Sequence, residues 1–237
     1  MKGWPGEPQM NYDVLVGEGN AADAMGKPID NVIFDFGNVL IYWNPEAALL
    51  PRYDKETIDR FLDNDVSGFY DANDRMDAGA TTEEGIAWLR ETHGDKWADM
   101  LRYYLDNFRD SLVGVVPGAR VLINDLKAAG IGVWGLSNWE ASLFHIAEEQ
   151  CDIIQQLDGK LVSGFVKLRK PHKEIYERAL QDFGIDAEGS VFVDDKAMNV
   201  VGANEAGIRG VRFSDPQKLR ELLIANGVDI PAVQSVR

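Results

Sequence analysis

The chain has 237 residues and a formal net charge of -15 at pH 7. Its length allows one substantial core, or one core with a small accessory domain. The negative charge works against binding to nucleic acids or anionic membranes, so we expect neither as a partner. The single cysteine, Cys151, excludes an intrachain disulfide and a cysteine-rich metal site.

The sequence has no segment that we expect to direct it into or across a membrane. No apolar run approaches the roughly 18 residues of a membrane span, and the first residues lack the basic and apolar regions of a signal peptide. The lack of a cysteine pair fits a reducing compartment. We therefore expect a cytoplasmic protein, and we expect it to be a monomer or a homodimer.

The first 29 residues differ in composition from the rest of the chain. They are rich in glycine, proline, asparagine and aspartate and show no strong periodicity. This pattern predicts an N-terminal extension, residues 1–29, that packs loosely or is partly disordered. Met10 and Met25 leave open a shorter natural start.

From Val32 onward, short apolar runs alternate with amphipathic stretches. The runs are typical of parallel strands, and the amphipathic stretches are typical of helices, several of which end at a glycine. We expect strands at Val32–Asp35, Ile131–Ser137, Val191–Asp194 and Gly210–Phe213, and helices at Gly118–Ala129, Glu140–Glu149, Lys173–Phe183, Ala197–Ala206 and Pro216–Ala225. The alternation predicts an α/β fold with a doubly wound, Rossmann-like parallel sheet, formed by residues 30–43 and 117–237.

Residues 44–116 interrupt this alternation with helical patterns and no convincing strand. The expected helices are Pro45–Leu50, Lys55–Asp63, Val66–Ala72, Thr82–Glu91 and Lys96–Phe108. Because this module follows the first strand, it would lie over that strand's carboxyl end, and we interpret it as a helical cap. Residues near that end are candidate substrate contacts, although most aromatic ones would pack in the cap's own core. The candidates are Trp43, Asn44, Tyr70, Asn73, Asp74 and Arg75.

Carboxylates stand where two of the predicted strands end. Asp35 ends the first strand, Asp194 and Asp195 end the third, and Asn199 follows within the next helical turn. Because the carboxyl ends of parallel strands meet at one edge of a sheet, this is where such a fold presents its chemistry. Two adjacent acids are unfavourable without a compensating cation, and carboxylate oxygens suit Mg²⁺. We also expect Asp195 to cap the helix that follows.

Two further segments could contact an anion. Ser137 and Asn138 end the second predicted strand, and either could donate a hydrogen bond to a phosphoryl oxygen, although both are also common turn formers. Lys170 precedes Pro171 and a predicted helix, where its ammonium could contact a substrate anion. A single lysine, however, is more often a solvated surface charge.

The four segments, in this order, resemble the motifs of the haloacid dehalogenase-like hydrolases. They are Asp35-Phe36-Gly37-Asn38-Val39-Leu40, Ser137-Asn138, Lys170-Pro171 and Asp194-Asp195. The resemblance covers residues 31–226 and includes a helical insertion of the type called a C1 cap. The first motif, with Asn199 after the fourth, resembles the subgroup that contains sugar-phosphate phosphatases such as glucose-1-phosphate phosphatase.

This resemblance implies a phosphomonoester hydrolase that forms an aspartyl-phosphate on Asp35. The cofactor would be Mg²⁺, held by Asp35, Asp194 and the backbone carbonyl of Gly37. The substrate would be a small phosphorylated metabolite, with a sugar phosphate favoured. Phosphoryl contacts would come from Lys170, Ser137, Asn138 and the backbone near Asn38, and support for the metal site from Asp195 and Asn199.

Gly37 departs from the family pattern, because phosphatases of the family typically have there an aspartate that serves as general acid and base. Such assistance is typically worth about 10²–10⁴-fold in rate. We therefore expect a bias toward substrates whose leaving group needs little protonation, such as sugar 1-phosphates or acyl phosphates. A cap residue or a bound water could also replace the carboxylate. His93, His145 and His172 are candidates in principle, although each is better explained as a surface or helix residue.

Two alternatives stay open. A haloacid dehalogenase would use the same first aspartate without a metal, but the Asp194-Asp195 pair favours a metal enzyme. A non-catalytic module that binds phosphorylated ligands or proteins is kept open by Gly37. Removal of the metal by a chelator would separate a phosphatase from a dehalogenase.

Overall fold

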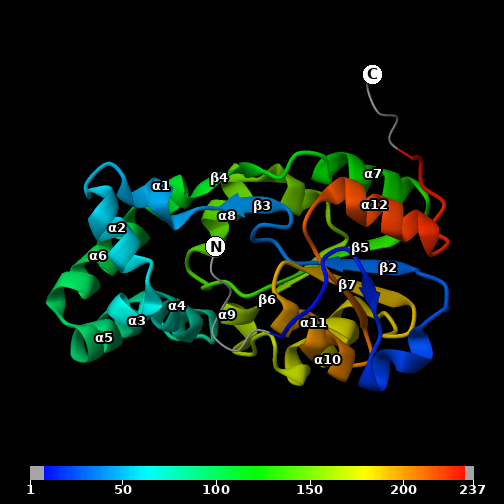
Figure 1. Ribbon diagram of the computed structural model, residues 1–237, viewed down its shortest axis with the longest axis horizontal. Coiled ribbons are helices and arrows are strands. Elements are labelled where there is room, and N and C mark those ends of the chain that lie inside the picture. The colour runs from blue at the N-terminus through cyan, green and yellow to red at the C-terminus, as the bar shows by residue number, and fades with distance from the viewer. Residues whose placement is uncertain (1–7, 233–237) are drawn as a thin grey trace.

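The computed structural model describes residues 8–232. Residues 1–7 of the expected extension and residues 233–237 of the expected core therefore lie outside the described residues. Within the described part, a six-stranded sheet carries helices on both faces, and a group of helices stands to one side of it (Figure 1). None of the helices in residues 8–232 has the length and apolar character that a bilayer span needs.

The main sheet has the strand order β1-β8-β7-β2-β5-β6, with β1 alone antiparallel to its neighbour. Its central strand β2 pairs in parallel with β5 and β7, so that Val32 lies opposite Val133 and Val191. All three valines are fully buried, as expected for strands covered on both faces. The strands are β1 (Leu15–Val16), β2 (Asn31–Phe34), β5 (Gly132–Ser137), β6 (Gly159–Val162), β7 (Ser190–Asp194) and β8 (Arg209–Arg212).

The order of connections places a switch point beside the central strand. From β2 the chain runs outward to β5 and β6, and it then returns to the other side of β2 to form β7 and β8. Helices α7 (Ala119–Ala128) and α12 (Pro216–Ala225) cover one face, and α10 (Lys173–Phe183) and α11 (Ala197–Glu205) cover the other (Figure 1). The predicted α/β, doubly wound sheet is therefore confirmed, and ligands of such sheets bind at the carboxyl ends of the strands that flank the switch point.

The described part of the N-terminal extension packs against this core, so the expectation of loose packing is wrong for it. Strand β1 pairs with β8, and a 3-10 helix, Gly19–Ala24, buries Ala21 and Ala24. The Asn204 side chain accepts a hydrogen bond from the Glu18 amide and donates one to the Val16 carbonyl. These contacts join backbone groups to a distant side chain, which the polar composition of the extension does not reveal.

The predicted helical cap is present as six helices, with Phe61, Phe69 and Trp97 in its aromatic core. One expected helix, Val66–Ala72, has different bounds because the chain turns at Gly68, whose φ of 69° is in the left-handed region that favours glycine. The helix after that turn extends to Asp77. The cap helices are α1 (Pro45–Leu49), α2 (Lys55–Phe61), α3 (Asn64–Ser67), α4 (Phe69–Asp77), α5 (Thr82–His93) and α6 (Asp95–Asp106).

Two short strands, neither of them expected, join the cap to the core; one lies at the end of residues 30–43 and the other within residues 44–116. Strand β3 (Ile41–Trp43) leads into the cap, and β4 (Leu112–Val115) leads out of it after a 3-10 helix, Phe108–Ser111. The two pair as an antiparallel ribbon with Ile41 opposite Val115. Each strand is too short to give a recognisable alternation in sequence, and the pairing joins segments far apart in the chain.

The remaining differences lie between β5 and α10. Helix α8 (Phe144–Gln150) begins four residues later than expected, because the Glu140 carboxylate accepts hydrogen bonds from the Leu143 amide and the Ser142 hydroxyl and holds a turn there. Strand β6 was not expected from its short sequence Gly-Lys-Leu-Val. A 3-10 helix, Asp152–Gln156, precedes it, and the four-residue helix α9 (Ser163–Val166) follows it.

Candidate active site

Asp35 is the first residue after β2, at the centre of the sheet edge. Its amide donates to the Val193 carbonyl, and the Phe36 carbonyl then accepts from the amides of Val39, Leu40 and Ile41. This tight turn has Asn38 at a φ of 59°, and Asp35 itself is only 8% exposed. The loop therefore fixes one carboxylate at the end of the central strand.

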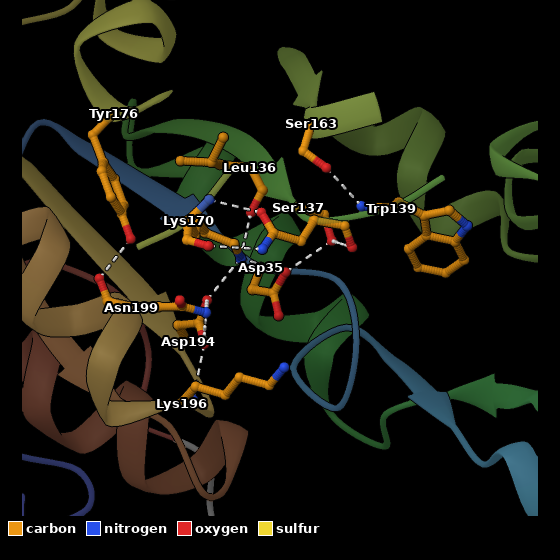
Figure 2. Close-up of polar contacts among 11 residues, drawn as sticks. Asp35, Leu136, Ser137, Trp139, Ser163, Lys170, Tyr176, Asp194, Lys196 and Asn199 are labelled. Atoms are coloured by element: carbon orange, nitrogen blue, oxygen red, sulfur yellow. Dashed lines mark hydrogen bonds and ion pairs between the residues drawn. The ribbon is translucent and has the colours of Figure 1, made fainter. Parts of the chain in front are cut away.

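Lys170 lies between the carboxylates of two neighbouring strands (Figure 2). Its Nζ is 2.8 Å from Asp35 Oδ1 and 2.7 Å from Asp194 Oδ2, and it also donates to the Leu136 carbonyl. An ammonium has three donors, so all of them are directed at protein acceptors. The Lys170 side chain is 1% exposed, which excludes the alternative of a solvated surface charge.

Ser137 and Asn138 fix the positions of Asp35 and Lys170. Ser137 Oγ donates to Asp35 Oδ1 over 2.9 Å. The side chain of Asn138 binds the backbone of Lys170 at both ends, accepting from its amide and donating to its carbonyl. Asn138 therefore holds the lysine loop against β5, and a direct phosphoryl contact by its side chain stays a prediction.

Asp194 is the most enclosed of the carboxylates, with no exposed surface. The Asn199 Nδ2 lies 3.0 and 2.9 Å from its two oxygens, and the Tyr176 hydroxyl donates to the Asn199 carbonyl. Asp194 Oδ1 also accepts from the Lys196 amide, and Lys196, rather than Asp195, occupies the N-cap of α11. The expectation that Asp195 takes the cap position is therefore wrong: α11 begins at Ala197, as expected, and the residue directly before it is Lys196.

Burial and mutual repulsion set the charge balance of this cluster. Burial raises the pKa of Asp35, with a further contribution from Asp194, while Lys170 and Ser137 act in the opposite direction. Burial alone would lower the pKa of Lys170, but Asp194 and Asp35 more than reverse this, so the ammonium stays charged. Burial, together with Asp194 and Asp35, raises the pKa of Asp195 to about 7.

The three carboxylates have the geometry and chemistry of a divalent-cation site. Among residues 8–232, oxygens of Asp35, Asp194 and Asp195 lie within 4.8 Å of one another. Lys170 pairs with two of these carboxylates, and a divalent cation would reduce the repulsion that remains among the three. Hard oxygen donors of this kind suit a divalent cation such as Mg²⁺.

A cavity lies over this cluster, and residues of the cap form part of its wall. Asp35, Gly37, Asn38, Ser137, Asn138, Lys170, Asp195 and Asn199 line it, as do four of the expected cap contacts: Trp43, Tyr70, Asn73 and Asp74. The other two expected contacts have different roles. Asn44 caps α1 through a hydrogen bond from the Glu46 amide, and Arg75 lies over the Trp88 ring. No histidine is part of the described lining.

One acidic residue of the lining, Asp77, was not anticipated from the sequence. It ends helix α4, and the expected helix stopped five residues before it. Its carboxylate belongs to the cap, so its place opposite the Asp35 loop depends on how α4 docks onto the core. Its spacing could have indicated this position, because Asp77 lies three residues after Asp74, an expected cap contact, and residues at that spacing share one side of a helix.

Known proteins share this architecture. The family model of the haloacid dehalogenase-like hydrolases matches residues 29–207 of this chain. A sesquiterpene phosphatase of Aspergillus oryzae is 28% identical over 209 residues, which are 81% of this chain and 95% of the relative. A glyceraldehyde 3-phosphate phosphatase of Pyrococcus abyssi is 28% identical over 130 residues, about half of each chain (51% and 51%).

A solved structure supports the fold independently of the sequence relatives. The magnesium complex of a HAD family enzyme from Bacteroides thetaiotaomicron superposes with a TM-score of 0.62 and 22% identity, covering 80% of this chain and 95% of that one. Residues 29–207, which the family matches, contain the four motifs that form the carboxylate cluster. The chain therefore belongs to the haloacid dehalogenase-like hydrolases and is an enzyme of the hydrolase class.

Proposed function

We propose that this protein is a Mg²⁺-dependent phosphatase that hydrolyses a small phosphorylated metabolite through an aspartyl-phosphate on Asp35. The observation that carries the proposal is the buried arrangement of Asp35, Lys170 and Asp194, with both ion-pair distances below 3 Å. Two buried carboxylates that share one ammonium keep a net negative charge, which a bound cation would offset, and buried ionisable clusters of this kind gather at functional sites. The two phosphatase relatives support phosphorus, rather than carbon, as the atom attacked.

In the first step, a carboxylate oxygen of Asp35 attacks phosphorus and the bond to the leaving oxygen breaks. Ser137 and Lys170 both bind Oδ1 of Asp35, which orients the carboxyl group and leaves Oδ2 as the attacking atom. In the second step, water attacks phosphorus and the bond from Asp35 to phosphorus breaks. Dividing hydrolysis between two displacements is the general advantage of a carboxylate nucleophile.

The described residues fit a resident Mg²⁺, which would be held by Asp35, Asp194 and the carbonyl of Gly37, with Asp195 beside them. When bound, this ion would neutralise the charge of the transferring phosphoryl group. Asn199 keeps both oxygens of Asp194 hydrogen-bonded and thereby fixes the orientation of that ligand. We also propose residues 44–116 as the cap that encloses the reaction.

The wall of the cavity formed by the cap suits an apolar or ring-shaped leaving group. Trp43, Tyr70 and Phe108 line it, and Trp43 is held by a hydrogen bond from its indole to the Tyr104 hydroxyl. Aromatic faces could stack on a sugar ring or pack against a hydrocarbon chain. We therefore keep a sugar phosphate as a candidate and add a sesquiterpenyl phosphate, in line with the Aspergillus relative.

The proposal is tested by measuring phosphate release from glucose 1-phosphate, glucose 6-phosphate, glyceraldehyde 3-phosphate, farnesyl phosphate and acetyl phosphate. Each reaction is run with Mg²⁺ and again with excess chelator. Release that depends on Mg²⁺ for at least one compound is expected. Halide release from a 2-haloacid in the presence of chelator would instead support the dehalogenase alternative, and binding without turnover would support the non-catalytic one.

A further inference from the structure

The loop after β2 leaves an open space where related phosphatases would carry a carboxylate. A Cβ added to Gly37 would have no atom within 4 Å, and the backbone there is not in the left-handed region. The glycine is therefore not required by crowding or by backbone conformation. The space beside it belongs to the cavity, so a proton donor from another element could occupy it.

Asp77 offers such a donor from the opposite wall. It is 8% exposed, and within residues 8–232 its carboxylate has no hydrogen-bond or ion-pair partner. Burying a carboxylate without a hydrogen bond or ion pair is costly, so no contact among residues 8–232 gives a structural reason for an acid at this position. Asp77 lines the same cavity as Asp35 and Gly37, so its carboxyl group borders the space in which a substrate of Asp35 would bind.

The surroundings of Asp77 favour its protonated form near neutral pH. It is the last residue of helix α4, where the negative end of the helix dipole disfavours an anion. Burial, with the charge of Asp74 on the same helix, raises its pKa to about 7, although Lys196, Arg169 and Lys170 act in the opposite direction. Tyr104 of α6 also faces it and is neutral, because burial raises its own pKa.

We propose that Asp77 is the general acid and base of the reaction, supplied by the cap in place of the residue missing at Gly37. The inference rests on the proposed phosphatase function and deepens it. As the bond from phosphorus to the leaving oxygen breaks, the Asp77 proton passes to that oxygen and the alcohol departs. Asp77, now a carboxylate, takes a proton from the water that attacks phosphorus, and inorganic phosphate leaves Asp35.

This assignment changes the expectation drawn from Gly37 alone. With Asp77 in place, the enzyme protonates alkoxide leaving groups and does not need a substrate with an acidic alcohol. The wild-type rate should therefore depend only weakly on the pKa of the leaving group. Without Asp77 the dependence should become steep.

The test compares Asp77→Asn with Asp71→Asn, an exposed acid on the same helix. The value of kcat/KM is measured with Mg²⁺ for 4-nitrophenyl phosphate, which needs little protonation, and for glucose 6-phosphate, an alkyl phosphate. We expect Asp77→Asn to lose about 10²–10⁴-fold on the alkyl phosphate and less than about 10-fold on the nitrophenyl ester. The fall in kcat/KM above neutral pH, visible for the wild type with the alkyl phosphate, should disappear. Asp71→Asn should behave as wild type.

A second variant uses the open space beside the loop. Gly37→Asp in the Asp77→Asn background should recover at least part of the lost alkyl-phosphate activity, because its carboxyl group enters the same cavity. An equal loss on both substrates, no loss on either, or a double variant as impaired as the single one overturns the role of Asp77. A wild-type protein inactive on every phosphate ester would instead overturn the proposed function.

Discussion

Replacing Lys170 with methionine tests the electrostatics of the site most severely. The side chain is 1% exposed and its Nζ joins Asp35 and Asp194, so the variant leaves two buried carboxylates without their shared cation. Breaking a buried ion pair from one side typically destabilises a protein by about 3–5 kcal/mol. For a chain of this size that corresponds to a fall in Tm of about 6–20 °C.

The loss of unfolding free energy in Lys170→Met should increase with pH. Without Lys170 the pKa of Asp35 in the folded state, already raised by burial, rises further, so the folded variant takes up protons more readily than the unfolded chain. The variant's deficit should therefore be largest at pH 8 and smaller at pH 5.

Urea unfolding in the presence of a chelator, followed by circular dichroism at both pH values, measures this deficit. Lys173→Met is the matched control, because that exposed lysine pairs with Glu177 on the surface of α10, where solvent screens the pair and its contribution to stability is small. A Lys170→Met protein within 1 kcal/mol of this control at pH 8, allowing about 10% error in the extrapolation, would refute the account of a cation held between two carboxylates.

Three further changes address other parts of the site. Asp77→Asn should stabilise the protein, because burial raises the pKa of the Asp77 carboxyl from 3.8 to about 7 in the folded state. The gain in unfolding free energy should grow by about 2–3 kcal/mol between pH 5 and pH 8. An equal gain at both pH values would contradict this. Asn199→Ala removes both hydrogen bonds to Asp194 and should raise the Mg²⁺ concentration that gives half-maximal activity by about 10–100-fold. An unchanged Mg²⁺ titration would count against the metal site. Gly202→Ala would place a Cβ 2.1 Å from the Pro171 carbonyl and should lower stability by about 1–3 kcal/mol, with the lysine loop displaced; thermal unfolding at the wild-type temperature would contradict that close packing.

Much of the site could be predicted because its residues directly follow buried strands. Asp35, Ser137 and Asp194 each stand at the end of an apolar run, and parallel strands bring such ends together. The place of Lys170 before Pro171 suggests an anion contact, but only the resemblance joins it to the other motifs, since it lies in a loop between α9 and α10 and reaches the site through its long side chain and its hydrogen bonds to Asn138. Asp77 was not predicted as a site residue, because its position depends on how helix α4 of the cap packs onto the core.

In the fold too, elements with a clear local sequence pattern could be predicted, and elements that depend on distant partners could not. Helices Lys173–Phe183 and Pro216–Ala225 have the bounds expected from their periodicity and their glycine or proline boundaries. The short strands β1, β3, β4 and β6 were missed because two to four residues carry little pattern, and their partners are distant in sequence. Packing of the N-terminal segment likewise depends on Asn204 and Arg209, whose side chains bind its backbone carbonyls.

The most direct test of the central claim is to look for the phosphoryl group on Asp35. The protein is mixed with Mg²⁺ and its best phosphate substrate, quenched in acid within one turnover, and digested for mass spectrometry. The account predicts one phosphoryl group on the peptide that contains Asp35, removed by hydroxylamine, and neither adduct nor turnover in Asp35→Asn, a nearly isosteric variant that should keep its fold. Hydrolysis by Asp35→Asn at the wild-type rate, or turnover with the phosphoryl group found on another residue, would contradict it.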